Sequence, residues 1–485
     1  MTTISTSNHC QPTQESDYSS AQNGHSADNL FRQAMEFHQQ GEVEQAFSCY
    51  QQVVALEPDH LEACFYLGLL CSSSGALHEA VNWLEKAYGL APEESAIIYQ
   101  LGVNLFSLGR TRPAIDAFKK AVALDPGNWQ AAYNLGVAYF SCGKFNEAIA
   151  AYDKAARCNP QDSDIHFNLG LAWKAAGGYE NARLSYLCAL ETASDDAEIH
   201  YNLALVYKEL ALLDEAITAL EIAVALQPQF GEAYGNLGVL YLDKDMIEEA
   251  VFCYERLIDL DHNVSSARHI LAALKGETTD AAPEAYVRDL FDNFSSRFDE
   301  RLVNDLQYET PVSLKKLFFN VEGSSAAYGR LLDLGCGTGL VGEIFGDIVN
   351  HKTGVDLSPK MIEVAAAKNI YDHFAVASIA EFLEQDTSTY DLIIAADVFV
   401  YLGDLESIFP LVLDRLAING RMLFSTEYLE SGGYKLQLTG RYAHSDNYLH
   451  NLIHKNGMTI VAKERTNLRK EKGKWIEGEL YMLSK

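Results

Sequence analysis

The sequence predicts a multidomain protein, an all-α superhelix of repeats followed by an α/β domain with a mostly parallel sheet. Three observations predict it. The 485 residues exceed one hydrophobic core, a 34-residue pattern recurs seven times in the first half, and short apolar runs alternate with helical segments in the second. The expected parts are a disordered tail (1–26), seven repeats (27–264), a cap helix (265–275), a linker (276–284) and the α/β domain (285–485).

Small residues define the repeat. Alanine recurs every 34 residues from Ala46 to Ala250, and a glycine series with the same period lets the two helices of each unit approach closely. That series comprises Gly68, Gly102, Gly136, Gly170 and Gly238. A second series, which begins at Gly41, would relax the turn between the helices, and a proline such as Pro58 would end the second helix. The pattern resembles the tetratricopeptide repeat, which implies a stack of helix pairs.

Composition limits the partners and the compartment. Lys and Arg number 37 against 67 Asp and Glu, a formal net charge of -30, so neither nucleic acid nor an anionic membrane surface is expected to bind. The nine cysteines form no CxxC pair, so we expect neither a disulfide framework nor a bound metal. The polar N-terminal tail lacks the features of a signal peptide, and we therefore expect a cytoplasmic protein.

Four successive repeats carry asparagine at one position of the first helix, two residues before the glycine or alanine slot. They are Asn134, Asn168, Asn202 and Asn236. An amide side chain both donates and accepts hydrogen bonds, so a row of them on one face suits an extended peptide whatever its sequence. The row is similar to the asparagine ladder in the repeats of the O-linked N-acetylglucosamine transferases. The alternative interpretation is that asparagine is merely tolerated on this surface.

After Gly276 the 34-residue period disappears and short apolar runs predict parallel strands separated by helices. The runs are Leu331–Leu334, Thr353–Val355, Phe374–Ala377, Leu392–Ala395 and Met422–Ser425. Two later runs, Met458–Glu464 and Gly478–Leu483, are joined by a basic segment that contains Arg469. We expect these two runs to form an antiparallel hairpin with Arg469 in its turn.

A glycine-rich turn follows the first expected strand. Gly335, Gly337 and Gly339 permit a tight turn and let a ligand approach the backbone. The dinucleotide motif GxGxxG requires a glycine where this chain has Leu340, which argues against NAD. Asp333, two residues before the turn, would repel a diphosphate but attract an ammonium group.

Two more acids end neighbouring strands. Asp356 ends the second strand, where a carboxylate can accept from both hydroxyls of a ribose, and Asp397 ends the fourth beside the same crevice. With Asp333 and the glycine turn, these residues resemble the class I S-adenosylmethionine-dependent methyltransferases over roughly residues 285–485. The resemblance implies a Rossmann-like, mostly parallel seven-stranded sheet with an antiparallel C-terminal hairpin, and S-adenosyl-L-methionine as cofactor.

The resemblance also implies roles for single residues. Asp333 and the backbone of Gly335, Cys336 and Gly337 would hold the methionine end, and Asp356 would hold the ribose. The remaining expected cofactor contacts are Leu357, Met361, Ser378, Ile379 and Asp397. Most relatives have an aspartate at the position of Ser378, so a neutral bond to adenine should here replace a charged one, at a loss of roughly 1 kcal/mol.

Methyl transfer from a sulfonium is an in-line displacement, so the enzyme mainly aligns the reactants and needs a base only for a protonated nucleophile. The candidate catalytic residues are His444, Tyr401 and Glu427. His444 is the first choice because an imidazole titrates near neutral pH, although a lone histidine in such a loop can also be a helix cap or a surface residue. Arg441 could anchor an acceptor carboxylate.

The whole arrangement resembles the bacterial predicted methyltransferases that carry N-terminal tetratricopeptide repeats. The expected function is S-adenosylmethionine-dependent methylation, with the repeat groove recruiting a protein or peptide as acceptor or partner. Two alternatives stay open. One is an interaction scaffold with an inactive methyltransferase-like domain, which Ser378 favours, and the other is an NAD(P)-dependent oxidoreductase.

Overall fold

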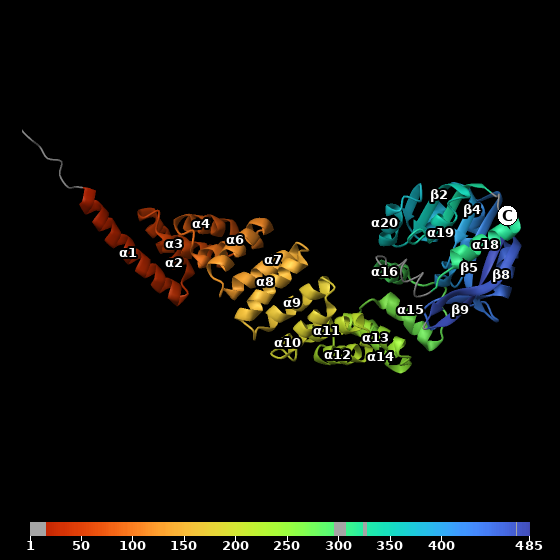
Figure 1. The fold of residues 1–485 in the computed structure, drawn as a ribbon, viewed down its shortest axis with the longest axis horizontal. Coiled ribbons are helices and arrows are strands. Elements are labelled where there is room, and N and C mark those ends of the chain that lie inside the picture. Colours follow the sequence, from red (N-terminus) through yellow and green to blue (C-terminus); the bar gives the residue numbers. More distant parts are fainter. Residues whose placement is uncertain (1–15, 295–306, 324–326, 472) are drawn as a thin grey trace, which may run out of the picture. The chain divides into compact units, whose positions relative to one another are not determined.

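The computed structural model describes residues 16–294, 307–323, 327–471 and 473–485, with side chains described for 26–292 and for the later ranges (Figure 1). The chain divides into two compact units, Met1–Phe230 and Gly231–Lys485. Residues 1–15 of the expected tail lie outside the described residues. Helix α1 begins at Ser16, inside that tail, because no proline interrupts the helix before the first repeat.

The first unit consists of helices in which each packs against the next. They are α1 (Ser16–Gln40), α2 (Val43–Leu56), α3 (Leu61–Ser73), α4 (Leu77–Leu90), α5 (Ser95–Ser107), α6 (Thr111–Leu124), α7 (Trp129–Ser141), α8 (Phe145–Cys158), α9 (Ser163–Ala175), α10 (Tyr179–Leu190), α11 (Ala197–Glu209) and α12 (Leu213–Leu226). The paired helices follow the 34-residue period, which confirms the predicted repeat architecture.

The two glycine series have the roles expected of them. A Cβ atom added to Gly136 would lie 2.6 Å from the ring of Tyr152. One added to Gly170 would lie 2.5 Å from the ring of Tyr186, so only glycine admits these aromatic rings. The turn glycines have φ angles between 70° and 80°, the left-handed region, at Gly41, Gly75, Gly109, Gly143 and Gly177.

The sixth repeat lacks the turn glycine and has Ala211 there, at a φ of 58°. An alanine in the left-handed region costs about 1–2 kcal/mol, of which the greater freedom of an unfolded glycine offsets part. We expect Ala211→Gly to stabilise the protein by up to about 1 kcal/mol. Urea unfolding followed by circular dichroism measures this. Ala204→Gly is the matched control inside helix α11, where glycine should destabilise by about 1 kcal/mol. Equal shifts for the two variants would contradict the explanation.

The second unit begins with four more helices, α13 (Gly231–Asp243), α14 (Ile247–Asp259), α15 (Val264–Lys275) and α16 (Glu284–Phe294), and continues after the undescribed segment with α18 (Thr310–Glu322). Helix α15 is the expected cap helix. Residues 276–284 have the irregular structure of a linker, yet they are bonded to the α/β domain. The backbone oxygen of Asp280 accepts from the amides of Gly403 and Asp404, each at 2.8 Å. This segment is therefore part of the domain surface.

In the part of the α/β domain that the structure describes, the strands form one nine-stranded sheet. Its strands are β1 (Tyr328–Leu334), β2 (Val349–Asp356), β3 (His373–Val376), β4 (Tyr390–Ala395), β5 (Leu416–Leu429), β6 (Tyr434–Leu436), β7 (Tyr442–Ser445), β8 (Thr459–Glu471) and β9 (Lys474–Ser484). Strands β3, β2, β1, β4 and β5 are neighbours in that order and parallel, β9 is antiparallel to β5, and β8 is antiparallel to β9. The predicted parallel sheet with a C-terminal hairpin is confirmed.

The predicted number of seven strands is too low by two. Strand β5 is long enough to pair with β9 along half of its length and with β7 at its last three residues, and β6 then pairs with β7. Strands of three and four residues carry too weak an alternating pattern to be found from sequence. Between the strands lie α19 (Leu340–Ile344), α20 (Pro359–Ala367), α21 (Ile379–Gln385), η3 (Phe399–Tyr401), α22 (Ile408–Arg415) and α23 (Asp446–Lys455).

Both faces of the sheet are buried. In β1, Leu332 and Leu334 belong to one hydrophobic cluster, whereas Leu331 belongs to another that also contains Phe318 of α18. A parallel sheet covered on both faces leaves the carboxyl ends of its strands as the place where a ligand can enter. The glycine turn and Asp356 lie at that edge.

Candidate functional site

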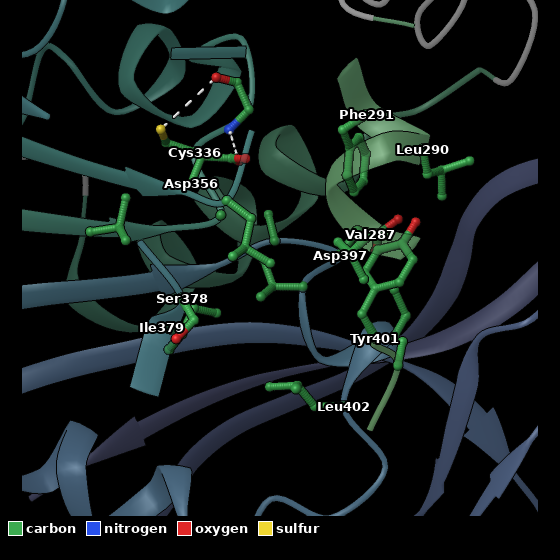
Figure 2. A pocket seen from close by; sticks show the side chains of 18 of the residues that line it. Val287, Leu290, Phe291, Cys336, Asp356, Ser378, Ile379, Asp397, Tyr401 and Leu402 are labelled. Carbon is green, nitrogen blue, oxygen red and sulfur yellow. Dashed lines mark hydrogen bonds between the residues drawn. The ribbon is translucent and has the colours of Figure 1, made fainter. Parts of the chain in front are cut away.

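A cavity of about 560 Å³ opens at the carboxyl ends of the parallel strands. Figure 2 shows its walls: Cys336 and Asp356 on one side, Ser378 and Ile379 below them, and side chains of helix α16 opposite. The three α16 side chains are Val287, Leu290 and Phe291. Most of the remaining lining is also aliphatic or aromatic, so the cavity is a largely apolar pocket with a few polar groups.

The amides of the glycine turn are already bonded within the chain. The amide groups of Gly335 and Cys336 both donate to the backbone oxygen of Val355, at 2.8 and 2.9 Å. The amide of Gly337 donates to Oδ2 of Asp356 at 2.8 Å, as Figure 2 shows. A turn that binds a diphosphate must offer free N–H groups, so this turn is poorly suited to NAD. It suits a ligand that donates hydrogen bonds to the backbone carbonyl groups of the turn.

Asp356 connects this turn with the next helix. Its Oδ1 accepts from the amide of Ser358 at 2.8 Å, and its Oδ2 from Gly337. Burial raises the pKa of the Asp356 carboxyl, and the two amide bonds act in the opposite direction. Each oxygen keeps a second lone pair, and the side chain lines the cavity, so Asp356 can accept hydrogen bonds from two neighbouring hydroxyls.

Asp333 lies in the interior behind the glycine turn. The side chain is fully buried and is not among the residues that line the cavity. Its Oδ2 accepts from the hydroxyl of Tyr371 at 2.5 Å, and its Oδ1 has no partner within the described residues. Burial raises the pKa of Asp333 to about 7. The side chain thus lies behind the turn, where Tyr371 holds it, and its contact with the methionine end stays a prediction.

The raised pKa of Asp333 makes stability depend on pH. The value of about 7 in the folded protein lies above the ordinary 3.8, so between these values the folded state binds more protons and stability falls as pH rises. Above pH 7 Asp333 is ionised in the folded and in the unfolded protein, and the free energy of unfolding stays at its lowered value. We expect Asp333→Asn, which cannot ionise, to raise the free energy of unfolding by up to about 4 kcal/mol at pH 8 and by less at pH 5. Thermal unfolding at both pH values measures this. The exposed Asp414→Asn is the control, and equal gains at both pH values would contradict the assignment.

The remaining predicted cofactor contacts are mostly at the cavity. Leu357, Ser378 and Ile379 line it, as do Gly335, Cys336, Gly337 and Asp397. Met361 does not, because it is fully buried on the inner side of α20. The Ser378 hydroxyl oxygen accepts from the amide of Glu381 at 3.3 Å and caps helix α21, so this side chain has a structural role beside any ligand contact.

A buried ion cluster forms another part of the wall. Arg469 is 3% exposed and donates to Oδ2 of Asp397 at 2.7 Å, to Glu427, and to Oε1 of Glu471 at 2.9 Å. Asp397 has a φ of 57°, and Ser425 donates to its Oδ1 at 2.9 Å. Glu427 is bonded to Arg469 and is not among the residues that line the cavity, so this geometry gives no support to its predicted role as a base. Arg469 belongs to strand β8 and not to the predicted turn, because β8 extends to residue 471.

The position of His444 gives no support to its predicted role as a base either. It is fully buried in β7, its Nε2 lies 3.0 Å from the backbone oxygen of Gly403, and it does not line the cavity. Burial lowers the pKa of His444 to about 4, so the imidazole is neutral at pH 7. The hairpin of β6 and β7, which the sequence did not predict, turns this residue into the core.

Tyr401 does line the cavity. Its hydroxyl accepts from Nε of Arg441 at 3.3 Å, and its ring lies against Phe291 with centroids 5.5 Å apart. Arg441 also lines the cavity and forms an ion pair with Glu471. Tyr401, Arg441 and Glu471 thus form a polar group distinct from the glycine turn. Glu471 and the α16 side chains Val287, Leu290 and Phe291 were not among the predicted site residues.

The asparagine row makes bonds within the repeats. The Nδ2 atom of each member donates to the backbone oxygen four residues earlier at 2.8–3.0 Å: Asn134, Asn168, Asn202 and Asn236. Asn134 and Asn168 also donate to Tyr99 and Tyr133 of the preceding repeat, at 3.2 and 3.1 Å. Lys174 donates to Oδ1 of Asn202 at 2.6 Å. The bonds with Tyr99, Tyr133 and Lys174 join neighbouring repeats. Fewer hydrogen-bonding groups of these amides are therefore available to a peptide.

Comparison with known families agrees with this geometry. Families described as tetratricopeptide repeat match residues 31–95, 99–163 and 143–198, and residues 197–230 and 231–263. A family described as methyltransferase domain matches residues 332–422, from the first strand to the fifth. The chain joins tetratricopeptide repeats to a methyltransferase domain. S-adenosylmethionine-dependence is the general class of such domains.

Two curated relatives are O-methyltransferases by name. The malonyl-[acyl-carrier protein] O-methyltransferase of Bacillus anthracis is 36% identical over 100 residues, which cover 20% of this chain and 37% of that protein. The ubiquinone biosynthesis O-methyltransferase of Xylella fastidiosa (strain 9a5c) is 28% identical over 134 residues, 27% of this chain and 53% of that protein. The chain thus spans between about a third and about half of these relatives. A crystal structure of MamA protein is 27% identical, covers 36% of this chain and 96% of that chain, and has a TM-score of 0.34.

Two kinds of feature are absent from the part of the chain that the structure describes. None of the described helices is long and apolar enough to cross a membrane. Within the same residues, no group of three or more His, Cys, Asp or Glu side chains is placed to hold a metal ion.

Proposed function

We propose that the protein is an S-adenosylmethionine-dependent methyltransferase whose repeats recruit a protein or peptide, in the cytoplasm. One observation carries the choice of cofactor: the amides of the glycine turn are bonded within the chain, beside the cavity-lining carboxylate of Asp356. The buried Oδ1 of Asp333, behind the turn and without a partner in the described residues, would gain negative charge if a nearby ammonium group lowered the pKa of this carboxyl. The residues present therefore fit this cofactor better than a nicotinamide dinucleotide.

S-adenosylmethionine supplies, when bound, a methyl group carried by a sulfonium. In the proposed complex Asp356 accepts from the ribose hydroxyls, and backbone oxygens of Gly335 to Gly337 accept from the amino group. Leu357 and Ile379 offer apolar contacts for the adenine, with Ser378 beside them. The apolar walls exclude water from the reacting atoms, which strengthens each of these interactions.

The acceptor end of the proposed site is the group of Tyr401, Arg441 and Glu471. No histidine is among the described residues that line the cavity, so proximity and alignment contribute most of the rate. Tyr401 stays the candidate catalytic residue, since its hydroxyl can bond an acceptor while Arg441 holds its oxygen. The names of the relatives above, both O-methyltransferases, support an oxygen acceptor of small size, free or carried by the recruited partner.

The asparagine row is the proposed contact for a recruited peptide. Asn134 and Asn168 are part-buried, and their described bonds use Nδ2, so Oδ1 stays available to accept from a peptide amide. Asn202 is buried and bonded to Lys174, which makes it the weakest member of the row. The strong negative charge of the chain favours a neutral or basic partner.

Isothermal titration of the full-length protein tests the proposal. We expect heat from S-adenosylmethionine and none from NADH or NADPH. Binding of a nicotinamide dinucleotide alone would overturn the proposal in favour of an oxidoreductase. If neither binds, the alternative of an interaction scaffold with an inactive domain holds, which Ser378 favours because its hydroxyl already caps α21.

A further inference from the structure

The cap helix α15 shares a core with the cavity wall. Ala272 and Ala273 of α15 belong to one buried cluster with Val287 of α16 and with Val400 and Tyr401 of the methyltransferase domain. Three of these residues, Val287, Val400 and Tyr401, line the cavity. The last helix of the repeat architecture is thus in contact with the residues that form the acceptor end of the proposed site.

One polar bond crosses this core. His269 of α15 is 3% exposed, and its Nε2 lies 2.9 Å from the backbone oxygen of Gly440. The ring lies between Tyr286, with centroids 5.0 Å apart, and Tyr442, with centroids 6.0 Å apart. Burial lowers the pKa of His269, so the imidazole is neutral and can donate from Nε2. A buried carbonyl that lost this donor would be left unpaired.

The loop around Gly440, whose backbone oxygen accepts from His269, packs closely against α15 and α16. Gly440 has a φ of 76°, and a Cβ atom there would lie 2.8 Å from the hydroxyl of Tyr286 and 3.0 Å from Cδ1 of Ile270. Within the loop, the amide of Gln437 donates to the backbone oxygen of Arg441 at 2.7 Å. The backbone of Arg441 is therefore fixed directly after the residue that His269 bonds.

We propose that His269 is a positioning residue for Arg441, so that the repeat cap forms part of the acceptor site. The inference rests on the proposed function, because Arg441 matters only if an acceptor binds beside Tyr401. His269 fixes the carbonyl of Gly440, the loop then presents Arg441, and Nε of Arg441 bonds the Tyr401 hydroxyl at 3.3 Å. Without that bond to Gly440, Arg441 loses its fixed orientation toward the cavity.

The test observes Arg441 directly and needs no acceptor. In the full-length protein labelled with ¹⁵N-arginine, the Nε–H resonance of Arg441 is assigned by its absence in Arg441→Lys. We expect His269→Phe, which keeps the aromatic ring but removes the donor, to speed exchange of this hydrogen with solvent by about tenfold or more. His269→Gln should restore slow exchange, because its side-chain amide can replace Nε2 as a donor. Arg268→Gln, an exposed neighbour on the same helix, is the control.

A second pair of variants tests the loop from its other side. Gly440→Ala should perturb the Arg441 resonance, whereas Gly432→Ala, also at a positive φ but with open space around it, should not. If His269→Phe does not fold, the comparison of Gly440→Ala with Gly432→Ala tests the proposal in its place. Unchanged exchange in both His269→Phe and Gly440→Ala would overturn the proposal. Titration with S-adenosylmethionine is read separately, so a failure of the proposed cofactor leaves the role of His269 in holding Arg441 independently testable.

Discussion

Replacing Asp356 with alanine should weaken the affinity of the full-length protein for S-adenosylmethionine by about 10- to 100-fold. The side chain is the proposed acceptor for the ribose hydroxyls, and a hydrogen bond to a charged group contributes about 1.5–3 kcal/mol. The variant also frees the amide of Gly337, so the turn loses one of its bonds to β2. Isothermal titration gives the dissociation constant.

The controls for Asp356 separate binding from folding. Asp356→Asn keeps one acceptor oxygen and should lose less affinity than the alanine variant. Met361→Leu changes a neighbouring residue that does not line the cavity and should leave the affinity unaltered. An alanine variant that binds the cofactor as tightly as the unaltered protein would refute the assignment of the ribose site.

Replacing Arg469 with methionine should destabilise the second unit by about 3–5 kcal/mol. The guanidinium is buried and is bonded to Asp397, Glu427 and Glu471, so its loss leaves carboxylates without a counter-charge inside the domain. The measurement is urea unfolding monitored by tryptophan fluorescence, in a protein whose only tryptophan is Trp475 of the same unit after Trp83, Trp129 and Trp173 are replaced by phenylalanine. Because Asp397 forms part of the cavity wall, cofactor affinity should fall as well.

Arg465 offers a matched comparison for Arg469. It lies on the same strand and pairs with Glu477, but both side chains are largely exposed, at 49% and 60%. An exposed ion pair contributes about 0–1 kcal/mol, so Arg465→Met should have a small effect. Similar losses for the two variants would show that the buried cluster has no special role.

The sequence predicted the helices and strands whose patterns depend on residues close together in the chain. The 34-residue period placed the helix pairs, and the apolar runs placed the five parallel strands and the terminal hairpin, although β5 and β8 extend well beyond their predicted ends. It also placed Asp356, Leu357 and Ser378 at the ligand edge, since the carboxyl ends of parallel strands meet there. These predictions depend on neighbours along the chain or on one topological rule.

The differences from the sequence predictions concern side chains whose environment comes from distant segments. Arg469 looked like an exposed turn residue because its partners Asp397 and Glu427 lie 72 and 42 positions away in the chain. His444 looked accessible because β6 and β7 are too short to be recognised. Asp333 seemed to face a ligand because nothing in its own strand indicates the hydroxyl of Tyr371.

The compact unit that contains the cavity starts at Gly231, at the beginning of the seventh repeat, whereas the match to the methyltransferase family starts at residue 332. The part of this protein that can be exchanged as one unit therefore includes the last repeat. A chimera that receives new repeats at residues 276–284 would discard His269 and disturb the backbone bonds of Asp280. A junction after Phe230 keeps both. Recombination between such proteins should therefore succeed more often between the sixth and seventh repeats than at the polar stretch that follows them.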